Sequence, residues 1–162
     1  MFQVSSFKFQ KKGFTLIELL IVISITIILA AGGIMNLARH RQERDLSLAA
    51  QEITIVLRNA QDRSIAQEEG SRWGVYFENP ASGSDFYELF QGINYGAATS
   101  VSKSVLRSNI QFDLPAAGSS STVVFSPIIG LPNVSTTIKI SLIGNPLSSS
   151  TIIINSNGEI QY

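Results

Sequence analysis

The chain has no cysteine and, among its 162 residues, only one histidine. The lack of cysteine excludes disulfide bonds, cysteine-based metal sites and a thiol nucleophile. The sequence also lacks an HExxH motif, a P-loop and the glycine signature of dinucleotide-binding folds, and its histidine lies far from the C-terminal half. These absences predict a protein that is not an enzyme, with no catalytic residues, no metal site and no cofactor.

An excess of charge of either sign is also lacking. Twelve lysine and arginine residues balance twelve aspartate and glutamate residues, so the formal net charge is zero. Neutralising the phosphates of a nucleic acid requires clustered basic side chains. From Trp73 onward the basic residues are only Lys103, Arg107 and Lys139. The sequence therefore argues against nucleic acid as a partner.

A long apolar run at residues 14–35 dominates the N-terminal region. At 1.5 Å per residue, a helix of this length crosses a bilayer about once. Its serine and threonine hydroxyls can bond to the preceding helical turn, which lowers their cost in lipid. Three lysines before the run favour a cytoplasmic N-terminus, although three arginines soon after it weaken that signal. We predict a single-pass transmembrane helix over 14–35, anchored in the cytoplasmic membrane.

Glu18 lies inside this apolar run. A charged side chain at the bilayer centre costs at least about 2.5–3.5 kcal/mol, so such a residue indicates a function and needs a partner. Three interpretations are open. The segment is an uncleaved signal anchor, a secretory signal peptide cut near Ala30 and Ala31, or a leader of a more specialised kind.

The stretch KKGFTLIELL, residues 11–20, distinguishes among them. It closely resembles the leader junction of type IV prepilins and type II secretion prepseudopilins, in which a short basic leader ends in glycine. Here the leader is residues 1–13, ending at Gly13, and Phe14 follows. The resemblance implies cleavage between Gly13 and Phe14 by a membrane prepilin peptidase, and then N-methylation of Phe14.

The same resemblance implies a role for Glu18, the fifth residue after the cut. Cleavage creates an ammonium at Phe14, and positions four residues apart lie on one helical face. The Glu18 carboxylate can pair with its own amine or, as the family implies, with the amine of a neighbouring subunit. Breaking a buried ion pair costs about 3–5 kcal/mol, so this assembly salt bridge would set the register between subunits.

Residues 36–70 predict an amphipathic second half of the same helix. Apolar or small residues recur in steps of three and four, at Ala49, Ile53, Leu57, Ala60 and Ser64. No proline interrupts the pattern before Gly70. We therefore expect one helix from residue 14 to about residue 69, with one face on a core. Two interpretations of Gly32 and Gly33 stay open: they form a weak point in the helix, or they allow close packing against another helix in the membrane.

Residues 71–162 predict a β-rich globular head. Alternating residues over 72–91 indicate a hairpin, and Asn157-Gly158 indicates the turn of a last hairpin. Serine-rich stretches at 118–121 and 148–150 are expected to be loops. The charges of Asp85 and Glu88 are expected to be solvated rather than to bind a cation. Further strands are expected at 103–107, 109–112, 122–125, 136–142, 151–155 and 159–162.

The expected fold class is thus α+β, a long N-terminal helix packed on a C-terminal antiparallel sheet, and the resemblance implies the pilin fold. The head is similar to the general secretion pathway protein H and FimT group of minor subunits. This implies a structural subunit of a type II secretion pseudopilus or a type IV pilus, with an extracytoplasmic head. Its implied partners are other pilin or pseudopilin subunits, the prepilin peptidase, an assembly platform with its ATPase, and membrane lipid. The alternative is a membrane-anchored extracytoplasmic binding module that does not polymerise.

Overall fold

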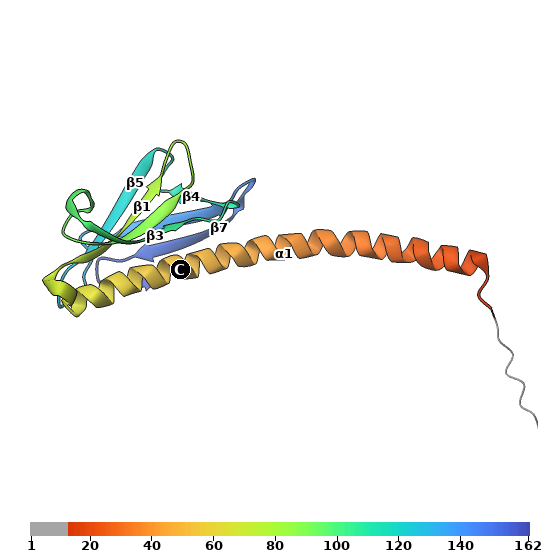
Figure 1. Cartoon of the computed structure of the whole chain (residues 1–162), viewed down its shortest axis with the longest axis horizontal. Coiled ribbons are helices and arrows are strands. Elements are labelled where there is room, and N and C mark those ends of the chain that lie inside the picture. The colour runs from red at the N-terminus through yellow and green to blue at the C-terminus, as the bar shows by residue number, and fades with distance from the viewer. Residues whose placement is uncertain (1–12) are drawn as a thin grey trace, which may run out of the picture. The chain divides into compact units, whose positions relative to one another are not determined.

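The computed structural model describes the backbone of residues 13–162, and the side chains of 13–30 and 39–162. The predicted leader therefore lies outside the described residues, except for Gly13. The chain divides into two compact units, one ending at Arg39 and the other running from His40 to Tyr162. The helix α1 (Leu16–Ile65) contributes to both (Figure 1).

The observed helix begins two residues after the predicted start at residue 14 and ends about four residues before the predicted end at about residue 69. After α1 comes a short 3-10 turn, η1 (Glu68–Gly70), in which Gly70 has a φ of 65°. The α-helical path ends before this glycine, because Gln67 and Glu69 already have left-handed φ values of 52° and 55°. Within the residues whose side chains are described, no helix is long and apolar enough to cross a membrane. Residues 31–35 of the predicted span have side chains outside that description.

The head contains two antiparallel four-stranded sheets (Figure 1). The first has the strand order β3-β2-β1-β5, and the second has the order β4-β6-β7-β8. The first comprises β1 (Trp73–Asn79), β2 (Phe86–Gln91), β3 (Thr99–Val105) and β5 (Ser119–Phe125). The second comprises β4 (Ile110–Leu114), β6 (Thr136–Leu142), β7 (Asn145–Ile154) and β8 (Ile160–Gln161).

Both predicted hairpins are present. Strands β1 and β2 pair from Trp73↔Gln91 to Glu78↔Phe86, and β7 pairs with β8 around the turn at Asn157-Gly158. The two predicted serine-rich loops are wrong in extent. Ser148–Ser150 lies within β7, and β5 already begins at Ser119. These serines join the strands through backbone hydrogen bonds, and the identity of their side chains does not indicate such pairing in the sequence.

One face of α1 supplies the helical part of the head core. Its members are fully or almost fully buried and follow the predicted steps of three and four: Leu46, Ala49, Ala50, Ile53, Leu57 and Ala60. The same core contains inward residues of the first sheet, such as Phe77 and Phe125, and of the second, such as Ile140. The apolar periodicity of 46–60 was therefore a correct indicator of the buried face.

Ser64 continues this face as a buried polar group. Its hydroxyl accepts a hydrogen bond from the backbone N–H of Trp73 at 2.8 Å and lies 3.3 Å from the Trp73 carbonyl oxygen. A buried hydroxyl is costly unless it is hydrogen-bonded. Here it ties the last turn of α1 to the first residue of β1, so the helix and the first sheet meet at a fixed point.

We expect Ile53→Ala to lower the free energy of unfolding by about 2–5 kcal/mol, because it removes most of a fully buried side chain and leaves a cavity. Ile55→Ala is the matched control, since Ile55 is 65% exposed on the same helix and its loss should cost within about 0.5 kcal/mol. Urea unfolding of the full chain in detergent, followed by Trp73 fluorescence, measures both. Equal effects of the two substitutions would contradict the assigned face.

Candidate functional site

Gly13 and Phe14 lie immediately before α1. A Cβ added at Gly13 would meet no atom within 4 Å, and the Phe14 side chain is 84% exposed. Residues 13–15 have no regular secondary structure. Among the described residues, nothing therefore shields the peptide bond between Gly13 and Phe14, which the sequence predicts to be the cleavage site.

Thr15 caps the start of α1, a feature that the sequence reasoning missed. The backbone N–H of Glu18 donates to the Thr15 hydroxyl at 3.3 Å, and the N–H of Leu19 donates to the Thr15 carbonyl at 3.2 Å. Thr15-Leu16-Ile17-Glu18 has the spacing of a capping box, in which threonine is the N-cap and glutamate lies three residues later. This spacing, just before an apolar run, was the signal available in the sequence.

The position of Glu18 in the first turn of α1 gives its carboxylate a local role in addition to the predicted intersubunit one. A carboxylate in the first turn interacts favourably with the positive end of the helix dipole. Within residues 13–162, the ion pairs do not include Glu18. The nitrogen of Phe14 is still part of the peptide bond to Gly13 in the uncut chain, so the amine expected to pair with Glu18 exists only after cleavage.

The first turns of α1 expose apolar side chains on every side. All large hydrophobic side chains from Phe14 to Leu29 are exposed. The hydroxyl groups in this stretch hydrogen-bond to the preceding helical turn, as predicted. The Ser24 hydroxyl donates to the Leu20 carbonyl at 2.8 Å, and the Thr26 hydroxyl lies 2.9 Å from the Ile23 carbonyl. A helix that is apolar all round is normally buried, either in lipid or among other helices.

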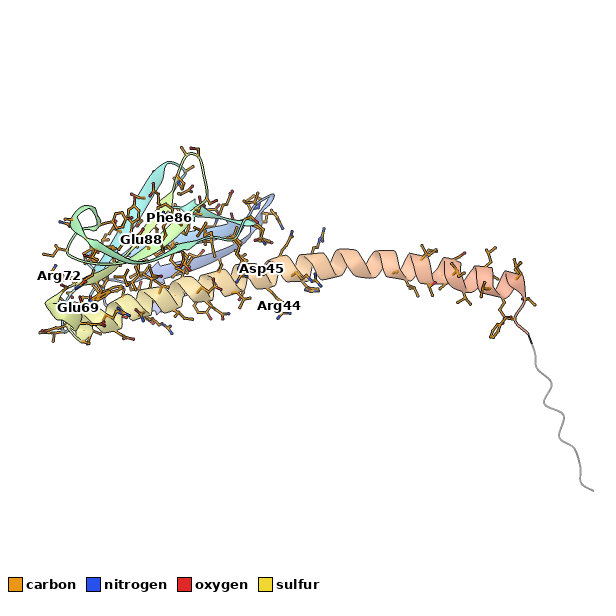
Figure 2. All side chains as sticks on the ribbon, in the orientation of Figure 1. Arg44, Asp45, Glu69, Arg72, Phe86 and Glu88 are labelled. Carbon is orange, nitrogen blue, oxygen red and sulfur yellow. The ribbon has the colours of Figure 1, made fainter. Side chains whose placement is uncertain are left out.

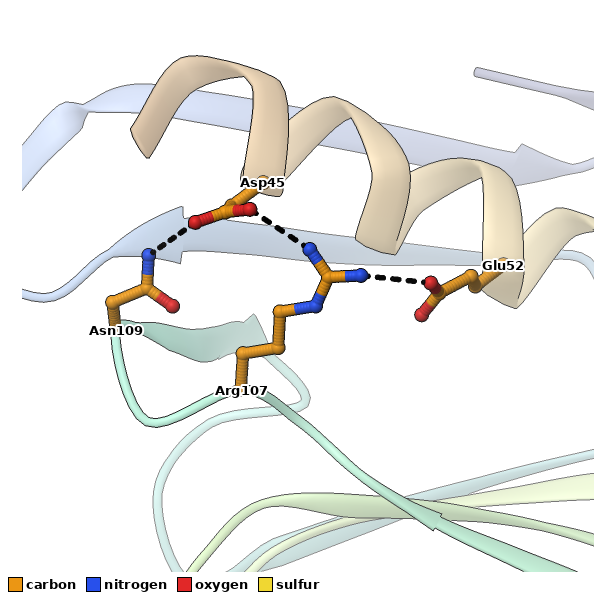
Figure 3. Close-up of polar contacts among 4 residues, drawn as sticks. All are labelled: Asp45, Glu52, Arg107 and Asn109. Atoms are coloured by element: carbon orange, nitrogen blue, oxygen red, sulfur yellow. Dashed lines mark hydrogen bonds and ion pairs between the residues drawn. The ribbon is translucent and has the colours of Figure 1, made fainter. Parts of the chain in front are cut away.

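In the head, a polar network joins α1 to the connection between β3 and β4 (Figure 3). The Arg107 guanidinium lies 2.9 Å from an Asp45 oxygen and 2.9 Å from a Glu52 oxygen. Asn109 donates to the other Asp45 oxygen at 3.4 Å. Isolated exposed ion pairs contribute little, whereas a network with good geometry contributes more. Arg107 therefore has a structural role, which its position in the sequence did not indicate.

Asp85 is not the solvated charge that the sequence predicts. Its carboxylate accepts the backbone N–H of Phe112 in β4 at 2.6 Å. Asn79, at the end of β1, donates from its side-chain amide to the carbonyls of Phe112 and Pro115, both at 2.9 Å. These contacts join the first sheet to the second and border an open cavity of about 580 Å³.

Glu88 is also not solvated, because only 6% of it is exposed. It accepts a hydrogen bond from the Tyr95 hydroxyl at 3.0 Å, and the Tyr95 ring stacks on Tyr76 with 3.7 Å between ring centroids. Tyr95 belongs to the short turn η2 (Tyr95–Ala97) between β2 and β3. Figure 2 shows Glu88 and Phe86 on the head, and the Lys103 ammonium lies 3.4 Å from the Phe86 ring centroid.

Removal from water, together with the hydrogen bond and negative charge of Glu88, raises the pKa of Tyr95 to about 12. Partial burial also raises the pKa of Tyr87. In the part of the chain that the structure describes, no group of three or more histidine, cysteine, aspartate or glutamate side chains is placed to hold a metal ion. His40 is exposed and lies 3.9 Å from Glu43.

The N-terminus and the head each resemble known proteins. Residues 8–34 match the family model for the prokaryotic N-terminal methylation motif. The fold is similar to that of the type IV minor pilin FimU of Pseudomonas aeruginosa, with a TM-score of 0.57 and 17% identity over 73% of this chain and 87% of that one. A second crystal form of FimU gives a TM-score of 0.54.

The minor pseudopilin EpsH from the type 2 secretion system of Vibrio cholerae is also similar. Its TM-score is 0.53 and its identity 14%, over 72% of this chain and 94% of that one. No curated protein sequence shows significant similarity to the chain. These findings confirm the resemblance seen in the sequence. The chain carries the N-methylation motif of prepilin-like proteins and has the pilin fold.

Glu88→Gln should lower the pKa of Tyr95 from about 12 toward the ordinary value of 10.0, because it removes a negative charge from the tyrosine hydroxyl. The raised pKa stabilises the fold below pH 10 and this contribution is lost as the pH rises through about 12. A pH titration of tyrosinate absorbance measures the shift, and Tyr95→Phe identifies the step that belongs to Tyr95. An unchanged titration in Glu88→Gln would show that the contact is not formed in solution.

Proposed function

We propose that the chain is a minor pilin or pseudopilin, a structural subunit that is cut between Gly13 and Phe14, methylated at Phe14 and assembled into a fibre through α1. The observation that supports this most strongly is the order of its parts. The methylation motif at residues 8–34 includes the start of α1, whose apolar side chains are exposed, and a head with the pilin fold follows.

The exposed helix explains why such a chain would assemble. Burying apolar surface contributes roughly 25 cal/mol per Å², and the side chains from Phe14 to Leu29 present a continuous surface of this kind. Before assembly, membrane lipid would cover it, with the head on the extracytoplasmic side. In the fibre, the equivalent helices of other pilin subunits would replace the lipid. The prepilin peptidase, the platform protein and the assembly ATPase are the further partners of this proposal.

The contacts at Thr15 help to separate two effects of Glu18. The Thr15 hydroxyl caps the helix by accepting the backbone N–H of Glu18, and the carboxylate of Glu18 takes no part in this contact. A change of the Glu18 side chain therefore leaves this cap in place. What it removes is the carboxylate charge, which interacts with the helix dipole by about 0.3–1 kcal/mol and would neutralise the Phe14 ammonium of the same or a neighbouring subunit. In a fibre core that excludes water, an ammonium without a counter-charge is strongly destabilising.

Mass spectrometry of the intact protein and of its N-terminal peptide, purified from the native membrane, tests the processing. We expect a chain that begins at Phe14 and is heavier by one methyl group. A chain that still begins at Met1, or that is cut near Ala31, would instead indicate an anchored binding module or a secreted domain.

Glu18→Ala should be cleaved and inserted normally but should enter the fibre at least about a hundredfold less, because an uncompensated buried charge costs about 3–5 kcal/mol. Thr15→Ala is the matched control: it removes the cap, at a cost of about 1 kcal/mol, and keeps the carboxylate. The measurement is the amount of each variant in the sheared fibre fraction relative to the membrane. Normal incorporation of Glu18→Ala would remove the proposed register role.

A further inference from the structure

The hairpin between β6 and β7 has an apolar tip. Ile143 in its turn is 56% exposed, and Leu147 near the start of β7 is 94% exposed. Single apolar residues are common on protein surfaces, so their exposure alone does not identify a partner. The position of the tip and the charges near it are what indicate one.

A bulge in β7 holds Leu147 out of the sheet. The register of β6 and β7 shifts near this end of the ladder, so residues 146–148 have no partner in β6. Extra residues of this kind bend a strand and redirect its side chains. The Asn145 side-chain amide donates to the Ser148 hydroxyl at 3.0 Å across the bulge. The strand pairing itself therefore directs Leu147 away from the head core.

The tip lies at the same end of the head as Asp45 on α1. The Ile143 N–H donates to the Asn109 carbonyl at 3.0 Å, and the Asn109 side-chain amide donates to Asp45 at 3.4 Å. A single residue thus links the tip to the helix. Figure 1 shows the β6–β7 hairpin projecting from this end of the head, and Figure 2 labels Arg44 next to Asp45.

Three arginines follow the apolar run on α1. Arg39, Arg41 and Arg44 come within nine residues of its end, and all three are exposed. Glu43 is the only carboxylate among these nine residues. At 3.6 residues per turn, the arginines lie on more than one face of the helix. Among the residues whose side chains are described, no ion pair includes any of the three.

The surface of a phospholipid bilayer fits both features. Headgroup phosphates surround a helix that leaves a bilayer, so they can pair with guanidinium groups on all of its faces, whereas a protein partner covers one face. Anionic lipids attract basic residues that lie close to a membrane span. Apolar side chains next to such residues can enter the boundary between headgroups and acyl chains. The arginines and the tip therefore indicate the same occupant.

We propose that the head docks on the surface of the membrane from which α1 emerges. Arg41 and Arg44 pair with the phosphates of anionic phospholipids, and Ile143 and Leu147 enter the interfacial layer. Because the helix and the hairpin meet the membrane at separate points, the contact fixes the tilt of the head until the chain is withdrawn into a fibre. The inference rests on the proposed function, since that function places the apolar run in lipid before assembly.

The lack of native cysteine allows a fluorescent label at one chosen position of the full-length chain. Ile143→Cys, labelled and reconstituted in vesicles of phosphatidylcholine and phosphatidylglycerol, should be quenched strongly by a quencher attached to lipid headgroups. Ile129→Cys is the matched control and should be quenched little, although Ile129 is also an exposed isoleucine, at 65%. Its neighbour Gly130 accepts a hydrogen bond from Gln61, which lies about 24 Å along α1 from Asp45.

The role of charge is tested by combining Arg41→Gln with Arg44→Gln. Each arginine near an anionic surface contributes roughly fivefold to the ratio of docked to free heads, so the double variant should lower this ratio about 25-fold. The label at Ile143→Cys should then be quenched no more than the label at Ile129→Cys. Vesicles of phosphatidylcholine alone should have the same effect on the chain that keeps its arginines. Arg41→Lys with Arg44→Lys keeps the charge and should retain most of the quenching.

Flotation of the vesicles shows whether the chain is in the membrane, which separates this inference from the proposed function. If the chain floats but the two labels are quenched equally, the docking contact is wrong and the proposed function stands. If quenching at Ile143→Cys persists in phosphatidylcholine alone or in the uncharged double variant, the anionic surface is not the occupant and the inference is likewise overturned. If the chain does not float with the vesicles, both proposals fail.

Discussion

The head depends on one stripe of α1, from Leu46 to Ala60, that is buried against inward-facing residues of both sheets. Two four-stranded sheets need a common apolar partner, because each presents one face that must be removed from water. The helix provides it, and Ser64 then fixes the point at which the chain turns from the helix into β1. Without this stripe neither sheet would have a complete core.

The sequence predicted the parts of the fold that depend on local pattern. Steps of three and four identified the buried face of the helix, alternation identified the hairpin of β1 and β2, and Asn157-Gly158 identified the turn before β8. It did not predict that the strands divide into two sheets. That division depends on contacts between distant residues, such as Asn79 with Phe112, which no local pattern contains.

In the candidate site, too, the sequence predicted features that depend on adjacent residues but not contacts between distant ones. The N-terminal motif was recognisable because its residues are adjacent in the sequence, and the match of residues 8–34 confirms it. The roles of Asp85, Glu88 and Arg107 were missed, because each depends on a partner from another element. Their charges look alike in the sequence, yet one joins two sheets, one is buried beneath a tyrosine and one links a loop to the helix. Thr15 was different, since its capping role was visible in the spacing to Glu18.

The polar contacts between α1 and the rest of the head also determine how the head bears mechanical load. Arg107 forms ion pairs with Asp45 and Glu52. The Gln61 side-chain amide donates hydrogen bonds to the carbonyls of Gly130 and Gly158, which belong to two separate loops. These attachments run from Asp45 to Gln61 and span more than four turns of the helix. A pull along the axis of α1 would therefore load them together in shear, instead of peeling them away one at a time. A head attached in this way is suited to remaining folded while its helix is under tension.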